Sequence, residues 1–360
     1  NILNARCLIV SLAVVLLAGC THLGPQTVTR DRFDYNTAIS DSWKEQTLLN
    51  IVKLRYADMP LFVEVASIVS GYTLEGSVNI AGGLSSSDSL QRDSFSLGSS
   101  GKYTDRPTIT YAPITGSQFN KSFMTPIPPR AVLFLMQSGW SAELIFPLTV
   151  DSVNGMRSQV AAGANQRAGD PGYYRVVELW NRIQKSGAIG MRIKKTEKEE
   201  DSTVMFFHRA KLSPEIQAVM EEGDQLLGLR PGLREASISY GFLPGSDSEI
   251  ALLTRSMLQI MIDLATRIDV PPGHVERGLT VPSLAEQGTG AVQASQMLRV
   301  KYSEERPGNA LTAVRYRDYW FWIDDSDFRS KRTFAFLMIL FSLTETGGKE
   351  GLPLVTIPAS

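Results

Sequence analysis

The sequence is poor in cysteine and histidine, two residue types that often carry metal and thiol chemistry. Its 360 residues include two cysteines, Cys7 and Cys20, and three histidines. Zinc sites are built mainly from thiolate and imidazole ligands, and a disulfide framework needs paired cysteines. We therefore expect no bound metal, no disulfide and no cysteine nucleophile in this chain.

The sequence also lacks an excess of charge and a long apolar run. Its formal net charge is −1, which gives no electrostatic reason to expect nucleic acid as a partner. The apolar stretches fall well short of the roughly 20 residues that a membrane-spanning helix needs. With 43% hydrophobic and 20% charged residues, the composition is typical of a folded globular protein.

The amino terminus has the pattern of a secretory signal. A basic residue, Arg6, precedes the apolar stretch 7–17, and small residues follow at positions 18 and 19. A short basic region, an apolar stretch of about 7–15 residues and small residues at the cut describe a signal peptide. The pattern predicts that residues 1–19 are removed from the mature protein.

The tetrad Leu17-Ala18-Gly19-Cys20 resembles the lipobox of bacterial lipoproteins. The resemblance implies cleavage between Gly19 and Cys20 and a covalent lipid on the thiol of Cys20, with no other cofactor. Thr21 stands where Asp would favour retention in the inner membrane. The resemblance therefore implies lipid anchoring in the outer membrane, most simply facing the periplasm, with surface display left open.

After the signal we expect three segments and an α+β fold. Residues 20–33 are predicted to be a lipidated tether, 34–116 a helix plus an extended hairpin region, and 117–360 an α+β globular domain. Apolar patterns indicate hairpins more often than βαβ units, which favours antiparallel sheets covered by helices.

Several elements within these segments rest on particular patterns. Polar residues recurring every fourth position predict one narrow stripe on an otherwise apolar helix at 249–268: Arg255, Gln259, Asp263 and Arg267. Ser246 to Glu249 has the spacing of a capping box that would begin this helix. The other expected elements are helices at 35–57, 130–138, 173–186 and 327–344, a helix from Ser213 to Gly228, strands at 142–150, 235–242, 297–303, 311–323 and 352–357, a hairpin at 191–209 and a loop at 271–296.

The stretch 71–112 differs from the rest of the chain in its pattern of apolar and polar residues. Tyr72, Leu74, Val78 and Ile80 alternate with polar residues, and a Gly/Ser-rich bend follows. This period of two predicts a Gly/Ser-rich amphipathic β-hairpin with one apolar face. The hairpin either packs on the domain or enters the outer membrane. In the second case it resembles, in outline, oligomeric outer-membrane lipoproteins such as the curli-secretion channel, whose subunits lend strands to a shared pore.

Three further groups are candidates for chemistry. The run Asp324-Asp325-Ser326-Asp327 either caps a helix or binds a divalent cation, and helix capping is favoured. His274 and Glu276 lie in a loop and include an acid and a base, but no nucleophile motif accompanies them. Weak candidates for an anion site are Arg315, Arg317, Lys331 and Arg332, with Tyr319 on the same predicted strand face as Arg315 and Arg317.

No catalytic residue emerges from these patterns. Short sequence segments between Arg315 and Thr333 are similar to those of uncharacterised bacterial envelope lipoproteins. We expect a non-enzymatic lipoprotein that is held to the membrane by its lipid and acts through contacts with envelope proteins or with copies of itself. The alternatives are a ring-forming pore subunit that contributes the 71–112 hairpin, and a hydrolase or ligand-binding lipoprotein.

Overall fold

The computed structural model describes residues 23–69, 72–83, 94–105, 108–160, 167–195, 201–209, 212–282 and 297–344. The signal peptide, the expected lipidation site Cys20 and the strand expected at 352–357 lie outside these ranges. The chain divides into two compact units, each described here by itself. The smaller unit is 61–115, and the larger comprises the residues before 61 and after 115.

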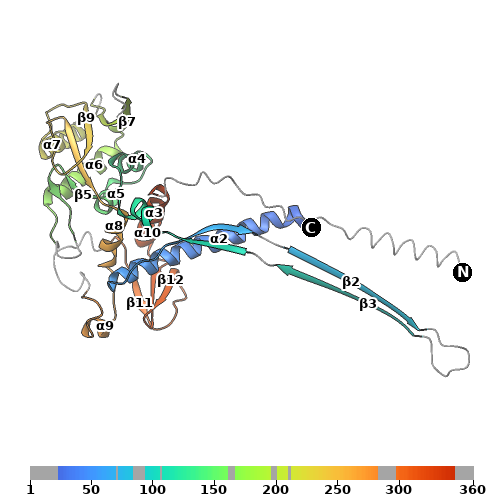
Figure 1. Ribbon diagram of the computed structural model, residues 1–360. Helices are drawn as coiled ribbons and strands as arrows, with labels where there is room; N and C mark the ends of the chain where they lie inside the picture. The colour runs from blue at the N-terminus through green and yellow to red at the C-terminus, as the bar shows by residue number, and fades with distance from the viewer. Residues whose placement is uncertain are drawn as a thin grey trace, which may run out of the picture. The chain divides into compact units, whose positions relative to one another are not determined.

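The fold belongs to the α+β class, as expected (Figure 1). The helical elements of the larger unit are α2 (Leu23–Arg55), α3 (Gly116–Phe119), the π-helical turn η1 (Asn120–Met124), α4 (Pro129–Gln137), α5 (Ala142–Thr149), α6 (Pro171–Lys185), α7 (Pro214–Leu227), α8 (Met257–Ala265), α9 (Pro272–Glu276) and α10 (Phe328–Thr344). Within the described ranges, no helix combines the length and the apolar run that crossing a membrane would require.

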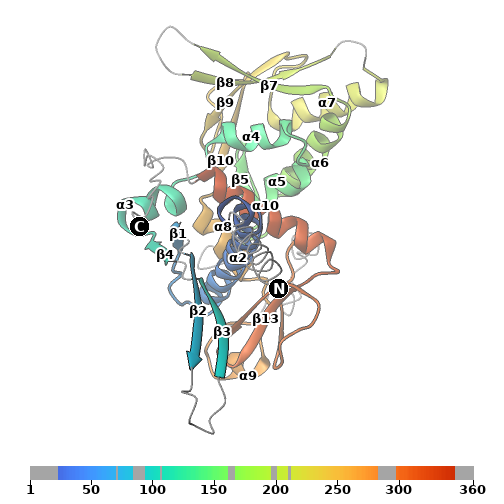
Figure 2. The ribbon, with the colours of Figure 1, turned by 90° about the vertical axis from the view of Figure 1, so that its right-hand side faces the viewer.

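A mixed six-stranded sheet has the order β6-β5-β10-β9-β8-β7. Its strands are β5 (Val150–Val153), β6 (Met156–Arg157), β7 (Ile189–Lys195), β8 (Asp201–Phe207), β9 (Glu235–Tyr240) and β10 (Glu249–Thr254). Only β9 and β10 run parallel, and the other neighbours are antiparallel. Helices α4, α5 and α6 pack against this sheet (Figure 2).

The helix expected at 249–268 is wrong in its first third. Residues 249–254 form β10, a nearly continuous buried strand, and α8 begins only at Met257. An apolar run without a period suits a strand buried on both faces as well as a buried helix. The capping box is made by Ser256 and Gln259. The capping-box spacing from Ser246 to Glu249 therefore predicted the wrong start for this helix.

The strand expected at 142–150 is also wrong, because residues 142–149 form α5. Six of its eight residues are buried, so no apolar stripe revealed the helical period. Pro147 lies inside this short helix and further disguises it in the sequence. The strand starts where the helix ends, at Val150.

A three-stranded antiparallel sheet has the order β11-β13-β12. Its strands are β11 (Lys301–Ser303), β12 (Ala310–Tyr316) and β13 (Tyr319–Asp324). The single strand expected at 311–323 is therefore a hairpin. Its two-residue turn is Arg317-Asp318, and both residues have positive φ, 47° and 70°. Such turns normally use Asn or Gly, so the sequence carried no turn signal.

Helix α2 is longer than the 35–57 expected from its apolar stripe. It begins at Leu23, within the segment expected to be a tether, and ends at Arg55. The buried side chains Leu48, Ile51 and Val52 lie in its carboxyl-terminal half, which packs against α8 and β12. From residue 32 onward, the described side chains of its first half are mostly exposed.

The smaller unit is a β-ribbon that is two strands wide and contains four strand segments. Its strands are β1 (Val63–Val69), β2 (Tyr72–Gly83), β3 (Ser94–Asp105) and β4 (Thr108–Pro113). β1 pairs with β4, and β2 pairs with β3, in both cases antiparallel (Figure 1). We call residues 61–115 the ribbon.

Candidate functional site

The ribbon keeps one pairing register along most of its length. Val69 is opposite Thr108 in the β1–β4 pair, and Tyr72 is opposite Asp105 in the β2–β3 pair. In both pairs the residue numbers add up to the same value, 177, so the two pairs continue one register. A β-bulge interrupts the ladder between Val65 and Ser67. The described residues of β2 and β3 thus pair without interruption, and those of β1 and β4 beyond the bulge follow the same register.

This register separates apolar from polar positions on both strands. On one set of alternate positions Leu74 is opposite Tyr103, and Ile80 is opposite Leu97. Because directly opposite residues of an antiparallel pair share a face, these positions belong to one apolar face. The remaining pairs on this face are Tyr72–Asp105, Gly76–Gly101, Val78–Ser99 and Gly82–Phe95. The structure describes the backbone of Tyr72, Leu74, Val78 and Ile80, whose side chains lie outside the described set.

The other face of β2 and β3 carries polar and small residues only. Glu75 is opposite Lys102, and the hydroxyl oxygens of Ser77 and Ser100 lie 2.7 Å apart in a hydrogen bond. Glu75, Ser77, Ser100 and Lys102 are all exposed. The remaining pairs on this face are Thr73–Thr104, Asn79–Gly98, Ala81–Ser96 and Gly83–Ser94. The ribbon therefore has the amphipathic character that the alternation in 71–112 predicted.

Both long strands have one unpaired edge. β2 and β3 form a two-stranded sheet, so no other described strand pairs with the outer edge of either. Proteins usually protect such edges with proline, charges or a covering element. The sequence from 72 to 105 contains no proline, and the charged residues of β2 and β3 are only Glu75, Lys102 and Asp105. These edges are suited to accept further strands.

The structure places the His274–Glu276 candidate in the larger unit. His274 lies in α9 and is 2% exposed, and its Nδ1 lies 2.7 Å from the hydroxyl oxygen of Tyr56. Burial lowers the pKa of His274, with Arg277 and Arg317 contributing, and burial raises the pKa of Tyr56 to about 12. Both shifts favour the uncharged forms, so the contact joins a protonated Tyr56 hydroxyl to a neutral imidazole. Glu276 is exposed, so the two candidate groups do not form an acid–base pair.

Tyr56 belongs to an aromatic and polar cluster that sequence reasoning missed. Tyr316 donates to Asp58 at 2.9 Å, and the Arg317 guanidinium lies 5.4 Å from the ring centre of Tyr56. Ala57, Arg317 and Asp318 have positive φ in this cluster. Left-handed backbone in residues other than glycine costs about 1–2 kcal/mol each and is retained only where the surroundings enforce it. The cluster fixes the end of α2 against the β12–β13 turn.

In the acidic run at 324–327, Asp327 caps α10, and Asp324 and Asp325 pair with lysines. The Asp324 carboxylate accepts hydrogen bonds from the backbone N–H and hydroxyl of Ser326 and from Lys301 Nζ, the last at 2.7 Å. The hydrogen bonds from Lys301 and Ser326 hold the pKa of Asp324 well below its usual range. Asp327 accepts from the N–H and hydroxyl of Ser330 in the first turn of α10. The capping interpretation is confirmed.

The four candidates for an anion site do not come together. Arg317 lies in the turn before β13, whereas Lys331 and Arg332 lie in α10, beyond the far end of that strand. Lys331 pairs with Asp325 at 2.6 Å, and Arg332 donates to the Ser141 hydroxyl. Exposed Arg315 lies on β12. The shared face expected for Arg315, Arg317 and Tyr319 does not exist, because the turn reverses the chain between them.

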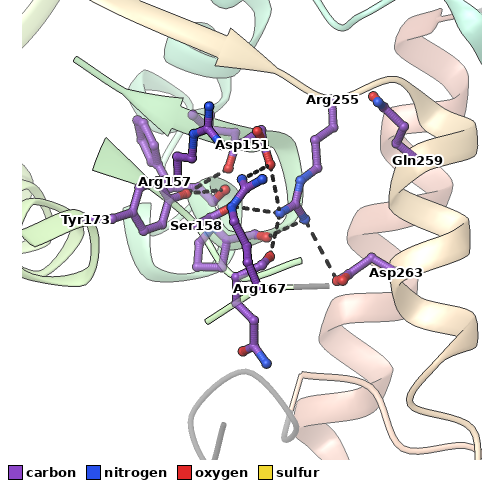
Figure 3. Close-up of polar contacts among 12 residues, drawn as sticks. Asp151, Arg157, Ser158, Arg167, Tyr173, Arg255, Gln259 and Asp263 are labelled. Atoms are coloured by element: carbon purple, nitrogen blue, oxygen red, sulfur yellow. Dashed lines mark hydrogen bonds and ion pairs between the residues drawn. The ribbon is translucent and has the colours of Figure 1, made fainter. Parts of the chain in front are cut away.

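Three residues of the polar stripe expected at 249–268, Arg255, Asp263 and Arg267, belong to a buried network, whereas Gln259 is exposed (Figure 3). Arg255, 5% exposed, precedes α8 and donates to the Ser158 hydroxyl at 2.6 Å and to the Gln159 carbonyl at 2.8 Å. Its guanidinium also lies 3.6 Å from Asp151 and 3.8 Å from Asp263. One arginine therefore links β5, the segment after β6, and α8.

Two more arginines complete this network. Arg167 pairs with Asp151, and Arg267 pairs with Asp263, both at 2.9 Å. Buried charges are tolerated mainly when they are paired, and each arginine of this network lies within 4 Å of a carboxylate. The network positions α8 on the sheet.

A shallow cleft of about 420 Å³ lies beside α7. Its walls include Met220, Leu229, Arg209 and Asp224. The two charged groups pair with each other at 2.7 Å, and the Arg209 Nε also donates to the Leu233 carbonyl. Burial raises the pKa of Asp224 although Arg209 opposes this shift. Arg209 and Asp224 are thus engaged within the protein.

Comparison with known proteins gives no relative for this chain: no family model, no curated protein and no solved structure matches it. The ribbon is therefore the candidate functional site on physical grounds alone.

Proposed function

We propose that this protein is a lipid-anchored lipoprotein of the outer membrane whose copies pair their ribbons edge to edge into a closed sheet that forms a pore. The observation that carries the proposal is the β2–β3 hairpin. Its two strands of 12 residues each pair in one register, with an apolar face, a polar face and two unpaired edges. The lipobox resemblance at Cys20 supports the membrane location.

The dimensions of the apolar face support insertion in a bilayer. Apolar positions extend from the Leu74–Tyr103 pair to the Gly82–Phe95 pair. Positions 74–82 comprise nine residues, and a membrane-spanning strand, which is tilted by about 45°, needs about 9–11. Spanning strands in the outer membrane carry an apolar band about 25 Å tall with aromatic residues at both of its borders. Tyr103 and Phe95 occupy these border positions.

The chemistry of the edges favours a second copy of the same chain as the partner. The outer edges belong to antiparallel strands of equal length, so β2 of one copy can pair antiparallel with β3 of the next. This head-to-tail contact uses two different surfaces and closes into a ring when the rotation permits. An open edge is not tolerated in lipid, where water cannot satisfy its N–H and C=O groups. Closure of the ring satisfies every edge.

Two neighbouring positions on β2 provide a matched test. Val78 lies on the apolar face and Asn79 on the polar face. A lysine facing lipid near the bilayer centre costs about 2–4 kcal/mol per copy, whereas a lysine facing water costs little. We expect Val78→Lys to abolish, and Asn79→Lys to retain, a detergent-stable oligomer measured by native mass spectrometry of lipidated full-length protein.

The pore itself is measured as conductance after reconstitution of the same preparations in planar bilayers. Wild type and Asn79→Lys should conduct, and Val78→Lys should not. A monomer as the only species in every mild detergent, together with cleavage of 72–105 by protease added to intact vesicles, would refute the proposal. Equal behaviour of the two lysine variants would also contradict it.

A further inference from the structure

We infer that Glu75 and Lys102 line the lumen of the pore as a charge-balanced ring, so that the pore does not select ions by the sign of their charge. The inference rests on the proposed function. Its structural basis is the register, which places Glu75 directly opposite Lys102 in every copy.

The face on which the two residues lie follows from their neighbours along the ribbon. Glu75 is followed on the same face by Ser77, and Lys102 is preceded on it by Ser100. The hydrogen bond between the two serine hydroxyls shows that this face is shared by both strands. All four side chains are exposed to water. In a closed sheet whose apolar face meets lipid, this face meets the lumen.

The charge of the lumen follows from the composition of this face. Besides Glu75 and Lys102, its paired positions in β2 and β3 are Thr, Ser, Asn, Ala and Gly, none of which is charged. Each copy therefore adds one negative and one positive charge at the same level of the pore. Rings of one sign select ions of the opposite sign, whereas a ring with equal numbers of both has no net potential to do so.

The polar face also keeps the lumen open near the tip end of the hairpin. From the Asn79–Gly98 pair onward the face consists of small residues, ending with the Gly83–Ser94 pair. The longest side chains of the face are those of Glu75 and Lys102, in the fourth pair from the start of β2. Because these side chains are the longest on the polar face of β2 and β3, the charged ring is the narrowest part of the proposed lumen along these strands. This ring is therefore the level that controls ion selectivity.

The test is the reversal potential of single pores in planar bilayers under a tenfold KCl gradient. Wild type should reverse near zero. Lys102→Glu makes the ring wholly acidic and should move reversal toward the potassium equilibrium potential. Glu75→Lys makes it wholly basic and should move reversal toward that of chloride.

The double variant Glu75→Lys/Lys102→Glu exchanges the two charges and should return reversal to near zero. Should either single variant fail to assemble, Lys102→Gln and Glu75→Gln leave a ring of one sign at lower charge and should shift reversal in the same directions. Wild-type protein that forms no pore contradicts the proposed function. Pores that form and whose reversal potential ignores all these substitutions overturn the inference alone.

Discussion

Loss of the Tyr56–His274 hydrogen bond should measurably lower the free energy of unfolding. Tyr56→Phe removes the hydroxyl that is hydrogen-bonded to Nδ1 of His274 and leaves that buried nitrogen without this partner. A buried donor or acceptor left unsatisfied costs about 1–3 kcal/mol. We expect the free energy of unfolding at pH 8 to fall by that amount.

The same pair makes stability depend on pH. Because the pKa of folded His274 is lowered, the unfolded chain binds a proton at higher pH than the folded protein does. The folded state is fully favoured above the ordinary histidine pKa of about 6.5 and loses stability as the pH falls through it. For one proton the slope cannot exceed about 1.4 kcal/mol per pH unit, and the loss levels off below the folded pKa.

The assay is urea unfolding followed by tryptophan fluorescence between pH 5 and 8. All five tryptophans lie outside 61–115, so the signal reports only the larger unit. The matched control is Tyr319→Phe, because Tyr319 meets the His274 ring edge-on at 5.2 Å through its own ring. Its effect should stay within about 0.5 kcal/mol. Equal losses for the two variants, or wild-type stability that rises on acidification from pH 8 to 6, would refute the reasoning.

Three further substitutions test the larger unit with the same urea assay. Gly223→Ala in α7 should stabilise by about 0.5–1 kcal/mol, because a Cβ there meets nothing within 4 Å and glycine is unfavourable inside a helix. Gly190→Ala should destabilise, because its Cβ would lie 2.3 Å from the Phe206 ring, and the reverse order would contradict this. Arg255→Met should cost about 3–5 kcal/mol by leaving buried carboxylates with one cation fewer. A loss below about 1 kcal/mol would show that the network is dispensable.

The sequence predicted those elements whose patterns are local. Helix α7 starts at the capping residue Ser213 and ends at Gly228 with φ of 65°, both as expected. The ribbon was predicted from alternation over only a few residues, because a face that differs from its opposite imposes a period of two.

The errors at β10 and α5 have the same physical cause, which is burial on all sides of the element. Strand β10 and helix α5 are almost wholly buried, so neither shows a polar face that would reveal its period. The β12–β13 turn was missed because Arg317 and Asp318 adopt a backbone that favours glycine or asparagine. Neighbouring tyrosines and the strand pairing enforce that turn, and both come from tertiary structure.

The candidate site was predictable in part. Alternation identified the apolar positions, but the partner of each residue across the hairpin depends on the register, which a long Gly/Ser-rich bend does not specify. The Glu75–Lys102 pair could therefore not be proposed from spacing. The Tyr56–His274 contact joins residues 218 positions apart, and no local pattern marks it.

In the proposed assembly each chain contributes two strands, and this number determines how the diameter of the pore depends on the number of copies. Strands about 4.8 Å apart and tilted by 35–45° each occupy about 6 Å of circumference. One copy thus adds about 12 Å to the circumference and about 4 Å to the diameter. The strand total is always even, and the bore widens in equal steps with the number of copies.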